Sequence, residues 1–519
     1  MFKHFKYILI FSIPLVLKYI FLLVFIEWDL FSFEDVIEDI LFLIGIYLLA
    51  ISNPFKKRFF VDLLCFLYLF YLVLETASYM AVSSNFSSSY MYLLIESNKQ
   101  ELSEFTSSYI SAPIVFFIIL TCVLFFVIRK NKFKTLNNYA SIVGVSGFIS
   151  IVFILKFTGI IESNAYHNIV RGAYGYVDLQ NSVTFNSEIK NKDINTIADN
   201  EVLVVVLGES TARGHMQIYG YNRETTPLLN TIKNNLYVYD NVISTDVFTL
   251  KSVPKMLTSL DVNFKEKDIF NIVEVFNAAN YDTYWLSNQR PISYHDNAIS
   301  KIASASTMFK FYNHTIDKHA LVLDEIILKD YEEILKKKGK KVVFVRLIGT
   351  HFDYNNRYPE SFNKFDINKS EKSIKESTIN QYDNAVLYND FIVHALINNL
   401  KKINKKSALL YLSDHGENIY DDGTDFFGRN EENFTKSMFE IPFILWTSKD
   451  FQFPNDFEYI PNRKFMADHF YESMGHVFGI MHKSIKADRS IFSKSFKPRK
   501  QKVLDNAIDF DNYFKKKHE

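Results

Sequence analysis

Three side chains that can bind a divalent cation stand directly after two strand-like runs of this sequence. Glu209 lies in LGES, after the apolar run 201–207, and Asp414 and His415 lie in LSDHGE, after the run 407–413. Two carboxylates and one imidazole form a ligand set that suits Zn²⁺ or, less well, Mn²⁺. An Asp-His pair after a strand can also cap the next helix, but a Glu after a second strand favours the metal. The sequence therefore predicts a metal site at these three residues.

A catalytic metal keeps one position open for a substrate or a nucleophile. The candidate nucleophiles are the hydroxyls of Ser244, Thr245 and Thr249, in STDVFTLKSVPKMLT. A hydroxyl is a weak nucleophile unless a base or a metal lowers its pKa, and Thr249 stands where a helix could begin. A Thr in that place is also a common N-cap. Spacing alone does not choose among the three hydroxyls.

Further polar residues lie close to the ends of strand-like runs. His351, in RLIGTHFDY, could bind a phosphate oxygen or protonate a leaving group, or it could be a packed side chain. His215 stands six residues after Glu209 and has the same two interpretations. Asn288 and Gln289, in WLSNQ, could orient a polar substrate or cap a helix.

Strand-like runs alternate with helix-like stretches in the last two-thirds of the chain. The runs are EVLVVVL (201–207), DTYWLS (282–287), KVVFVRLIG (341–349), SALLYLS (407–413) and IPFILW (441–446). The helix-like stretches are 224–235, 265–280, 317–337, 376–402 and 466–480. This alternation predicts an α/β domain with helices on both faces of a mostly parallel sheet. Polar clusters after three of its strands should converge at the carboxyl edge of that sheet.

The first third of the chain is apolar and predicts a transmembrane domain. Five segments approach the roughly 20 residues that span a bilayer, and they are 7–27, 37–55, 59–80, 110–128 and 136–160. Lys18 makes the first of them imperfect. Lys and Arg gather at the N-terminus and after the second and fourth spans, so these ends should be cytoplasmic, and everything after about residue 160 should lie outside. Asp62 and Glu75 fall within or near the third span, where an acid is either functional or close to the interface.

Composition and charge narrow the classes of function. The 519 residues carry no formal net charge, which argues against a nucleic-acid partner. The two cysteines, Cys65 and Cys122, lie in apolar runs, so no disulfide framework is expected. We expect five-span transmembrane residues 1–160, linker helices in 161–200, a catalytic domain in 201–495 and a solvated polar tail in 496–519.

Beyond these inferences, nearly all of residues 1–490 resembles the bacterial phosphoethanolamine transferases, whose outer domain is similar to the alkaline phosphatase and sulfatase superfamily. The motifs that carry this resemblance are GESTARGHMQIYGYNRETTP, TLKSVP, YWLSNQ, GTHFDYNNRYP, QYDNAVLYND, YLSDHGE and IESNKQELSEF. The resemblance implies a monomeric inner-membrane enzyme with a periplasmic catalytic domain and a zinc cofactor. It also implies phosphatidylethanolamine as the donor and lipopolysaccharide, at lipid A or a core sugar, as the acceptor.

The resemblance assigns roles to single residues. Glu209, Asp414 and His415 match zinc ligands, and Thr249 matches the Thr that accepts phosphoethanolamine and also contacts the zinc. This match chooses Thr249 among the three hydroxyls. The zinc ion would lower the pKa of Thr249 and polarise the phosphoryl oxygen.

Four residues are expected to bind substrate. His351 matches a histidine near the transferred phosphate, and it would stabilise the phosphate or protonate the leaving group. Asn288 and Gln289 are candidates for orienting the substrate, and Glu96, in the outer loop 81–109, is expected near the donor lipid.

The sequence departs from the family pattern in two places. Phe427 and Gly428 stand where many members have a histidine, and Arg429 could supply the missing phosphate contact. The outer domain has no cysteine, whereas the family often has disulfides there. Two alternatives stay open, a phosphoglycerol transferase of the lipoteichoic acid synthase type and a non-catalytic membrane-anchored binding protein. A sulfatase is disfavoured because the polar domain lacks the Cys or Ser motif for formylglycine.

Overall fold

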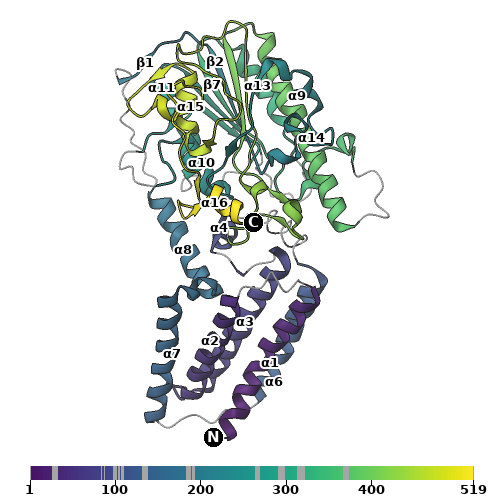
Figure 1. Ribbon diagram of the computed structural model, residues 1–519, viewed down its shortest axis with the longest axis vertical. Coiled ribbons are helices and arrows are strands. Elements are labelled where there is room, and N and C mark those ends of the chain that lie inside the picture. The colour runs from purple at the N-terminus through teal and green to yellow at the C-terminus, as the bar shows by residue number, and fades with distance from the viewer. Residues whose placement is uncertain are drawn as a thin grey trace. The chain divides into compact units, whose positions relative to one another are not determined.

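The structure, a computed structural model, forms two compact units (Figure 1). The first contains residues 1–97, 101–178 and 430–433, and the second contains 98–100, 179–429 and 434–519. The boundary near residue 178 falls inside the stretch 161–200 that was expected to be a linker. The residues that the structure describes are 2–25, 33–82, 85, 86, 88–96, 102, 106, 110–130, 138–182, 189, 193–263, 269–289, 298–312, 322–365 and 373–517.

Long helices make up the described part of the first unit. They are α1 (Phe2–Phe25), α2 (Phe33–Ser52), α3 (Arg58–Val82), α6 (Ala112–Lys130) and α7 (Asn138–Thr158). Of these helices in the described residues, all but α2 are apolar and long enough to cross a membrane, which makes four where five were predicted. The first turns of α2 carry four acids, in FEDVIED, and their charge explains the difference.

Three shorter helices complete the first unit as described. Helix α4 (Ser89–Glu96) lies in the outer loop, most of which beyond Glu96 is outside the described residues. Helices η2 (Ile160–Ser163) and α8 (Ala165–Ser182) follow α7, and α8 belongs mostly to this unit.

Ion pairs bind the helices of the first unit to one another. Nζ of Lys18, in α1, lies 2.7 Å from Oδ2 of Asp39, in α2, and both side chains are buried. Because a charge among apolar helices needs a partner, this pair explains why α1 tolerates a lysine. Glu75 is also buried within the helix bundle. Asp62, in the first turns of α3, instead pairs with the half-exposed Arg129 at 3.1 Å, close to the helix ends.

A seven-stranded sheet forms the centre of the second unit. In spatial order its strands are β3 (Leu236–Tyr239), β11 (Phe443–Thr447), β8 (Ser407–Ser413), β2 (Val202–Gly208), β7 (Lys341–Arg346), β5 (Asp282–Ser287) and β6 (Met308–Phe311). The strands from β8 to β6 pair in parallel, and β11 is antiparallel to β8 and β3. The predicted mostly parallel sheet is confirmed, with β2, β5, β7, β8 and β11 in the five predicted runs.

Helices cover both faces of this sheet (Figure 1). On one face, Leu203 and Val205 pack in a core with α10 (Thr249–Leu257), α11 (Ile272–Ala278), α12 (Ala298–Ser304) and α15 (Phe470–Val477). On the other face, Val204 and Val206 pack with α9 (Pro227–Thr231), α13 (Ile326–Lys336) and α14 (Ile374–Lys402). A strand buried on both faces requires a continuous apolar run, as seen in β2. Parts of two predicted helices, 265–280 and 317–337, lie outside the described residues.

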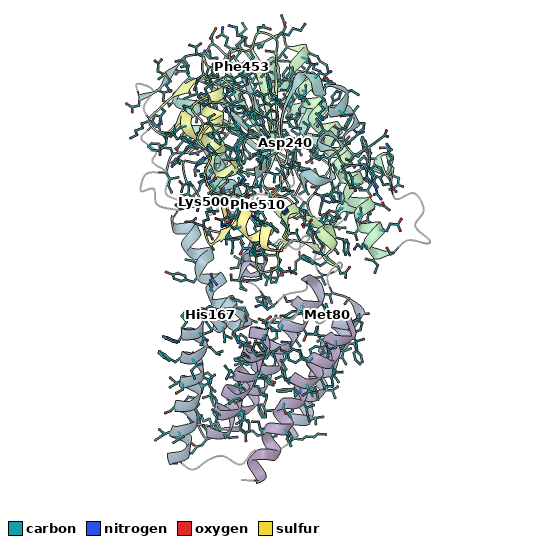
Figure 2. The ribbon with its side chains drawn as sticks, viewed as in Figure 1. Met80, His167, Asp240, Phe453, Lys500 and Phe510 are labelled. Atoms are coloured by element: carbon teal, nitrogen blue, oxygen red, sulfur yellow. The ribbon has the colours of Figure 1, made fainter. Side chains whose placement is uncertain are left out.

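The C-terminal residues are folded onto the second unit, which corrects the prediction of a solvated tail from residue 496. They form the hairpin β14 (Lys502–Val503) and β15 (Ile508–Asp509), followed by α16 (Phe510–Lys517). Phe510, labelled in Figure 2, and Phe514 are buried against Phe439 and Phe434. The many lysines of this segment led to the prediction of a solvated tail, although its apolar side chains anchor it to the second unit.

Candidate active site

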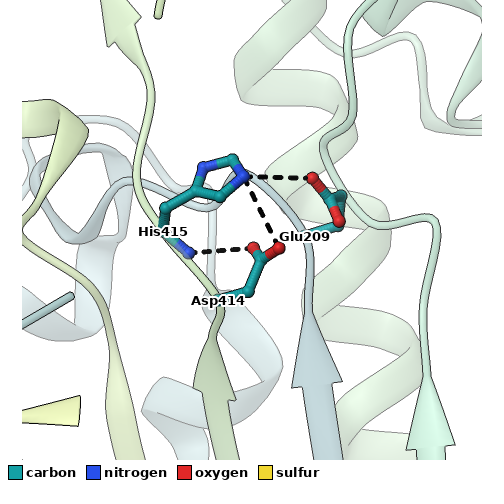
Figure 3. Close-up of side chains that lie close together, drawn as sticks. All are labelled: Glu209, Asp414 and His415. Atoms are coloured by element: carbon teal, nitrogen blue, oxygen red, sulfur yellow. Dashed lines mark hydrogen bonds and ion pairs between the residues drawn. The ribbon is translucent and has the colours of Figure 1, made fainter. Parts of the chain in front are cut away.

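The parallel pairing of β2 with β8 brings the predicted metal ligands together. Gly208, the last residue of β2, is paired with Ser413, the last residue of β8. Glu209 and Asp414 therefore leave the sheet side by side, and the amide of Ser210 donates to Oδ1 of Asp414 at 3.2 Å. Figure 3 shows Glu209, Asp414 and the next residue, His415, converging at this carboxyl edge. The predicted convergence holds for these two strand ends.

The three side chains offer a compact set of metal-ligand atoms. One atom from each of Glu209, Asp414 and His415 lies within 4.8 Å of the others, and all three residues are buried. Nε2 of His415 is 3.3 Å from Oε1 of Glu209 and 3.5 Å from Oδ2 of Asp414 (Figure 3). Burial and the charge of Glu209 raise the pKa of Asp414 to about 6.

Two details show that this set fits a cation. Nδ1 of His415 donates to the carbonyl oxygen of Gly416 at 2.8 Å, so Nε2, which lies beside the two carboxylates, is the ring nitrogen left to bind a cation. Oδ2 of Asp414 is buried and accepts no hydrogen bond among the described residues. A buried carboxylate oxygen without a donor is costly, and a divalent cation would satisfy it.

The structure brings Thr249 to the same point. Thr249 is the first residue of α10, and its Oγ1 lies 3.1 Å from each carboxylate oxygen of Glu209 and 3.2 Å from Nε2 of His415. Its side chain does not cap the helix, since Phe248 is the N-cap residue and makes no side-chain capping bond. The N-cap alternative is therefore wrong.

The two competing hydroxyls point elsewhere. Ser244 donates to the carbonyl oxygens of Asp246 and Asp414, at 2.8 and 2.7 Å. Thr245 donates to a carboxylate oxygen of Asp246 at 2.7 Å. Only Thr249 among the three predicted candidates presents its hydroxyl to the metal ligands.

The neighbouring amides Asn288 and Gln289 have different environments. Gln289 donates from Nε2 to Oε2 of Glu209 at 2.7 Å and to the carbonyl oxygen of Leu347 at 2.9 Å. Asn288 instead donates to Oδ1 of Asp324 and to the carbonyl oxygen of Val322, both at 2.9 Å. Gln289 therefore orients a candidate metal ligand, whereas Asn288 holds a neighbouring loop. Their predicted roles in substrate binding stay predictions.

His351 and His215 lie in unlike surroundings. Burial, together with Arg357 and Arg429, lowers the pKa of the His351 ring to about 3, although the charge of Glu209 opposes this. His351 is thus neutral, and its Nδ1 has no partner among the described residues. His215 is instead paired with two carboxylates away from Glu209, as described below. Glu96 is the last residue of α4, and its side chain lies outside the described residues.

Arg429 enters the site, as its position two residues after Phe427 suggested. Its Nη1 lies 2.7 Å from Nε2 of His415, 3.1 Å from Oγ of Ser210 and 3.5 Å from Oε1 of Glu209. Its Nε lies 3.6 Å from a carboxylate oxygen of Glu417. Burial raises the pKa of Glu417 to about 7. Glu417 was missed as a site residue, although it stands in the quoted SDHGE motif.

An α/β sheet with Glu, Thr, Asp and His gathered at its carboxyl edge defines a protein of the sulfatase class, and the sulfatase family model matches residues 201–480. Phosphoethanolamine transferase EptC of Escherichia coli (strain K12) is 30% identical over 501 residues, with 83% of each chain covered. Phosphoethanolamine transferase CptA of Salmonella typhimurium is 30% identical over 486 residues, with the same coverage. The chain therefore belongs to the phosphoethanolamine transferases of the sulfatase family.

Solved structures agree with this assignment. The periplasmic domain of EptC from Escherichia coli, in complex with zinc, has 32% identity and a TM-score of 0.58, and covers 62% of this chain and 95% of its own. The integral membrane phosphoethanolamine transferase A of Neisseria meningitidis has 20% identity and a TM-score of 0.70, and covers 94% of this chain and 97% of its own. The second likeness concerns the fold alone, and it extends over both units.

Proposed function

We propose that the protein transfers phosphoethanolamine from phosphatidylethanolamine to lipopolysaccharide, with Thr249 as the nucleophile. The observation that carries this proposal is the position of Thr249 Oγ1, 3.1 Å from both oxygens of Glu209 and 3.2 Å from His415. Membership of the phosphoethanolamine transferase family supplies the reaction class. A hydroxyl held among metal ligands is the arrangement that activates a threonine for attack.

Zinc is the proposed cofactor. Glu209, Asp414 and His415 would hold it, with Thr249 as a further contact, and this nitrogen and oxygen set suits Zn²⁺ better than Mg²⁺. Bound zinc would lower the pKa of the Thr249 hydroxyl and offset negative charge on the phosphoryl group. The zinc in the solved domain of the Escherichia coli relative supports this choice.

The reaction then proceeds in two displacements at phosphorus. Oγ1 of Thr249 loses its proton and bonds to the phosphorus of the donor, the bond from phosphorus to the glycerol oxygen breaks, and diacylglycerol leaves with a proton. An acceptor oxygen of lipid A or a core sugar next loses its proton and bonds to the same phosphorus, and the bond to Oγ1 breaks. Thr249 regains its proton. Arg429 and neutral His351 can donate hydrogen bonds to the phosphoryl oxygens in both steps.

We also propose a cellular location for the protein. Its helices would lie in the bacterial inner membrane with the catalytic unit in the periplasm, where the donor lipid is reached from the outer leaflet. This orientation counts α2 as a span together with the four apolar helices, so that the Lys and Arg residues at the start of α1, between α2 and α3 and at the end of α6 lie on the side opposite to the catalytic unit. We expect the protein to act as a monomer.

Mass spectrometry tests the proposal at the residue and at the product. Wild-type protein incubated with phosphatidylethanolamine should carry a phosphoethanolamine adduct, and fragmentation of the peptide should map it to Thr249. The Thr249→Ala variant should carry no such adduct on Ser244 or Thr245. Deletion of the gene should remove a phosphoethanolamine increment from lipid A or core, and only wild type should restore it. Full transferase activity of Thr249→Ala would refute the nucleophile.

The same experiment, repeated with phosphatidylglycerol as the donor, separates the two alternatives. A phosphoglycerol adduct on Thr249 would indicate a transferase of the lipoteichoic acid synthase type. A protein that forms no adduct and binds no divalent cation would be a membrane-anchored binding protein. The metal-ligand set and the family relationship favour the phosphoethanolamine transferase over both.

A further inference from the structure

A tight turn near the C-terminus contacts the segment that carries Thr249. Leu504, Asp505 and Asn506, which connect β14 to β15, all have positive φ angles, of 52°, 54° and 67°. We call these three residues the C-terminal turn. A left-handed backbone is unfavourable for Leu in particular, so the surrounding contacts must hold this conformation. One of them joins the amide of Leu504 to the carbonyl oxygen of Thr245, at 2.9 Å.

A buried lysine links the same turn to both sides of Thr249. Nζ of Lys255, in α10, lies 2.8 Å from Oδ2 of Asp246 and 2.9 Å from Oδ1 of Asp505. Lys255 and Asp246 are fully buried, and Asp505 also pairs with Lys251 at 3.3 Å. Asp246 precedes Thr249 by three residues, and Lys255 follows it by six. The ion pairs therefore fix the backbone before and after the nucleophile.

Because Lys255 is buried, its charged partners must keep their positions. A charge removed from water is tolerated only when its partners stay in place, and loss of one partner leaves the other uncompensated. The buried ammonium group of Lys255 donates to both carboxylates, at 2.8 Å to Asp246 and 2.9 Å to Asp505. Any displacement of the C-terminal turn would therefore move Lys255 and the helix that begins at Thr249.

The residues after the turn support the other side of the site. Phe510 packs against Phe439, at a ring-centroid distance of 5.7 Å. The carbonyl oxygen of Phe439 accepts from the amide of Ser244 at 2.8 Å, and that of its neighbour Met438 accepts from Gly416 at 2.9 Å. Gly416 directly follows His415. The C-terminal segment thus borders both the nucleophile segment and the metal-ligand loop.

We propose that the C-terminal turn, through Asp505, Lys255 and Asp246, positions Thr249 for attack on phosphorus. This proposal rests on the proposed function, since it assumes that Thr249 is the nucleophile. The three charged residues are positioning residues, because they act through the backbone of α10 and do not touch Thr249 Oγ1. Ion pairs centred on the buried Lys255 would fix this segment in a domain that has no cysteine and so no disulfide.

Asp505→Asn in the full-length protein tests this proposal. Asn tolerates a left-handed backbone and removes only the charge that faces Lys255 and Lys251. We expect kcat for adduct formation on Thr249 to fall by about 10- to 100-fold, as for a small misplacement of a reacting atom. KM for phosphatidylethanolamine and the bound zinc per protein should stay unchanged, because the substrate contacts and the ligands are untouched.

Asp488→Asn is the matched control. Asp488 has the same 43% side-chain exposure as Asp505 and also pairs with a lysine, Lys497, at 3.3 Å, and among the described residues it makes no ion pair with α10. It should keep the wild-type kcat. Melting temperatures of both variants, measured in the assay buffer, show whether the protein is folded during the assay. If Asp505→Asn does not fold, Lys251→Gln removes the outer contact to Asp505 and should lower kcat in the same direction.

The outcomes separate this proposal from the proposed function. Equal kcat for folded Asp505→Asn and Asp488→Asn, with Thr249→Ala inactive, would overturn the positioning role and leave Thr249 as the nucleophile. A rise in KM without a fall in kcat would also overturn it. Activity in Thr249→Ala would refute the proposed function itself.

Discussion

At the scale of single residues, two neighbouring amides have separable tasks. Gln289 donates to Glu209 at 2.7 Å, whereas Asn288 donates to Asp324 and does not reach the ligands. Partners that orient a ligand typically contribute about 10- to 100-fold to metal affinity. We therefore expect Gln289→Ala to weaken zinc binding by that factor, as measured by competition with a chelator of known affinity.

Asn288→Ala supplies the contrast. It removes a donor from the buried carboxylate of Asp324, which also accepts the amides of Ile348 and Gly349. Loss of this hydrogen bond to a buried carboxylate should lower the free energy of unfolding by about 1–3 kcal/mol, with little change in zinc affinity. Equal zinc affinities for wild type and Gln289→Ala would contradict the orienting role.

Arg429 is the residue expected to bind the transferred phosphate. It lies within 3.5 Å of Glu209 and is anchored on the other side by Glu417. We expect Arg429→Gln to lower kcat by about 100- to 1,000-fold, the usual cost of losing one preorganised donor. Arg429→Lys should recover part of this loss, since a lysine keeps the charge without the planar fork. Wild-type kcat in Arg429→Gln, with zinc content unchanged, would show that another group binds the phosphate.

At the scale of elements, His215 joins three segments that are distant in sequence. Its Nδ1 lies 2.8 Å from Asp383, in α14, and its Nε2 lies 3.3 Å from Asp421, the first residue of the short helix η9 (Asp421–Gly423). Tyr221 and Arg223 also bind Asp383, at 3.0 and 2.8 Å. These contacts give the HMQIYGYNR stretch a structural role that its sequence did not reveal.

The His215 contacts predict how stability depends on pH. Burial lowers the pKa of His215, but its hydrogen bonds to Asp383 and Asp421 outweigh burial and raise it from 6.5 to about 9. A group whose pKa is raised on folding stabilises the folded protein. This stabilisation is complete below the pKa of the unfolded state and is lost as pH rises through the pKa of the folded state. The ion pairs should therefore contribute about 3 kcal/mol near pH 6 and almost nothing above pH 9.

Thermal melts from pH 6 to pH 10 test this expectation. The difference in melting temperature between wild type and His215→Gln should be largest at pH 6 and should shrink between pH 7 and pH 10. His394→Gln, in α14, is the control: burial lowers the pKa of His394, so its substitution should not give a difference that shrinks as pH rises. A difference that stays constant with pH would mean that His215 is not charged in the folded protein.

The sequence predicted the strands near the site better than the elements at the rim. β2, β7 and β8 are apolar because both faces of the sheet are covered, and the motifs after them mark the carboxyl edge. β3 and β6 were missed because each is a four-residue edge strand with partly exposed residues. The folded C-terminal segment and the Lys18–Asp39 pair were missed because their charged residues find partners only in three dimensions.

At the scale of the whole molecule, the two units have separate sources of stability. The helices of the first unit share a core that includes Phe11, Tyr47 and Leu72. The second unit has its own two cores, one on each face of the sheet. The candidate active-site residues Glu209, Thr249, Asp414 and His415 all belong to the second unit. Chemistry and attachment to the bilayer should therefore be separable.

A fragment of residues 179–519 should fold cooperatively and bind one zinc ion with the affinity of the full-length protein. The fragment should form the Thr249 adduct from a short-chain phosphatidylethanolamine in solution, because every residue of the metal-ligand set is present. On phosphatidylethanolamine in vesicles, however, its rate should be at least about 100-fold below that of the full-length protein, since tethering to the bilayer raises the effective concentration of the donor. The Thr249→Ala fragment gives the background. Equal rates on vesicles for the fragment and the full-length protein would show that the helices contribute nothing to donor capture, and failure of the fragment to bind zinc would show that the first unit helps to form the site.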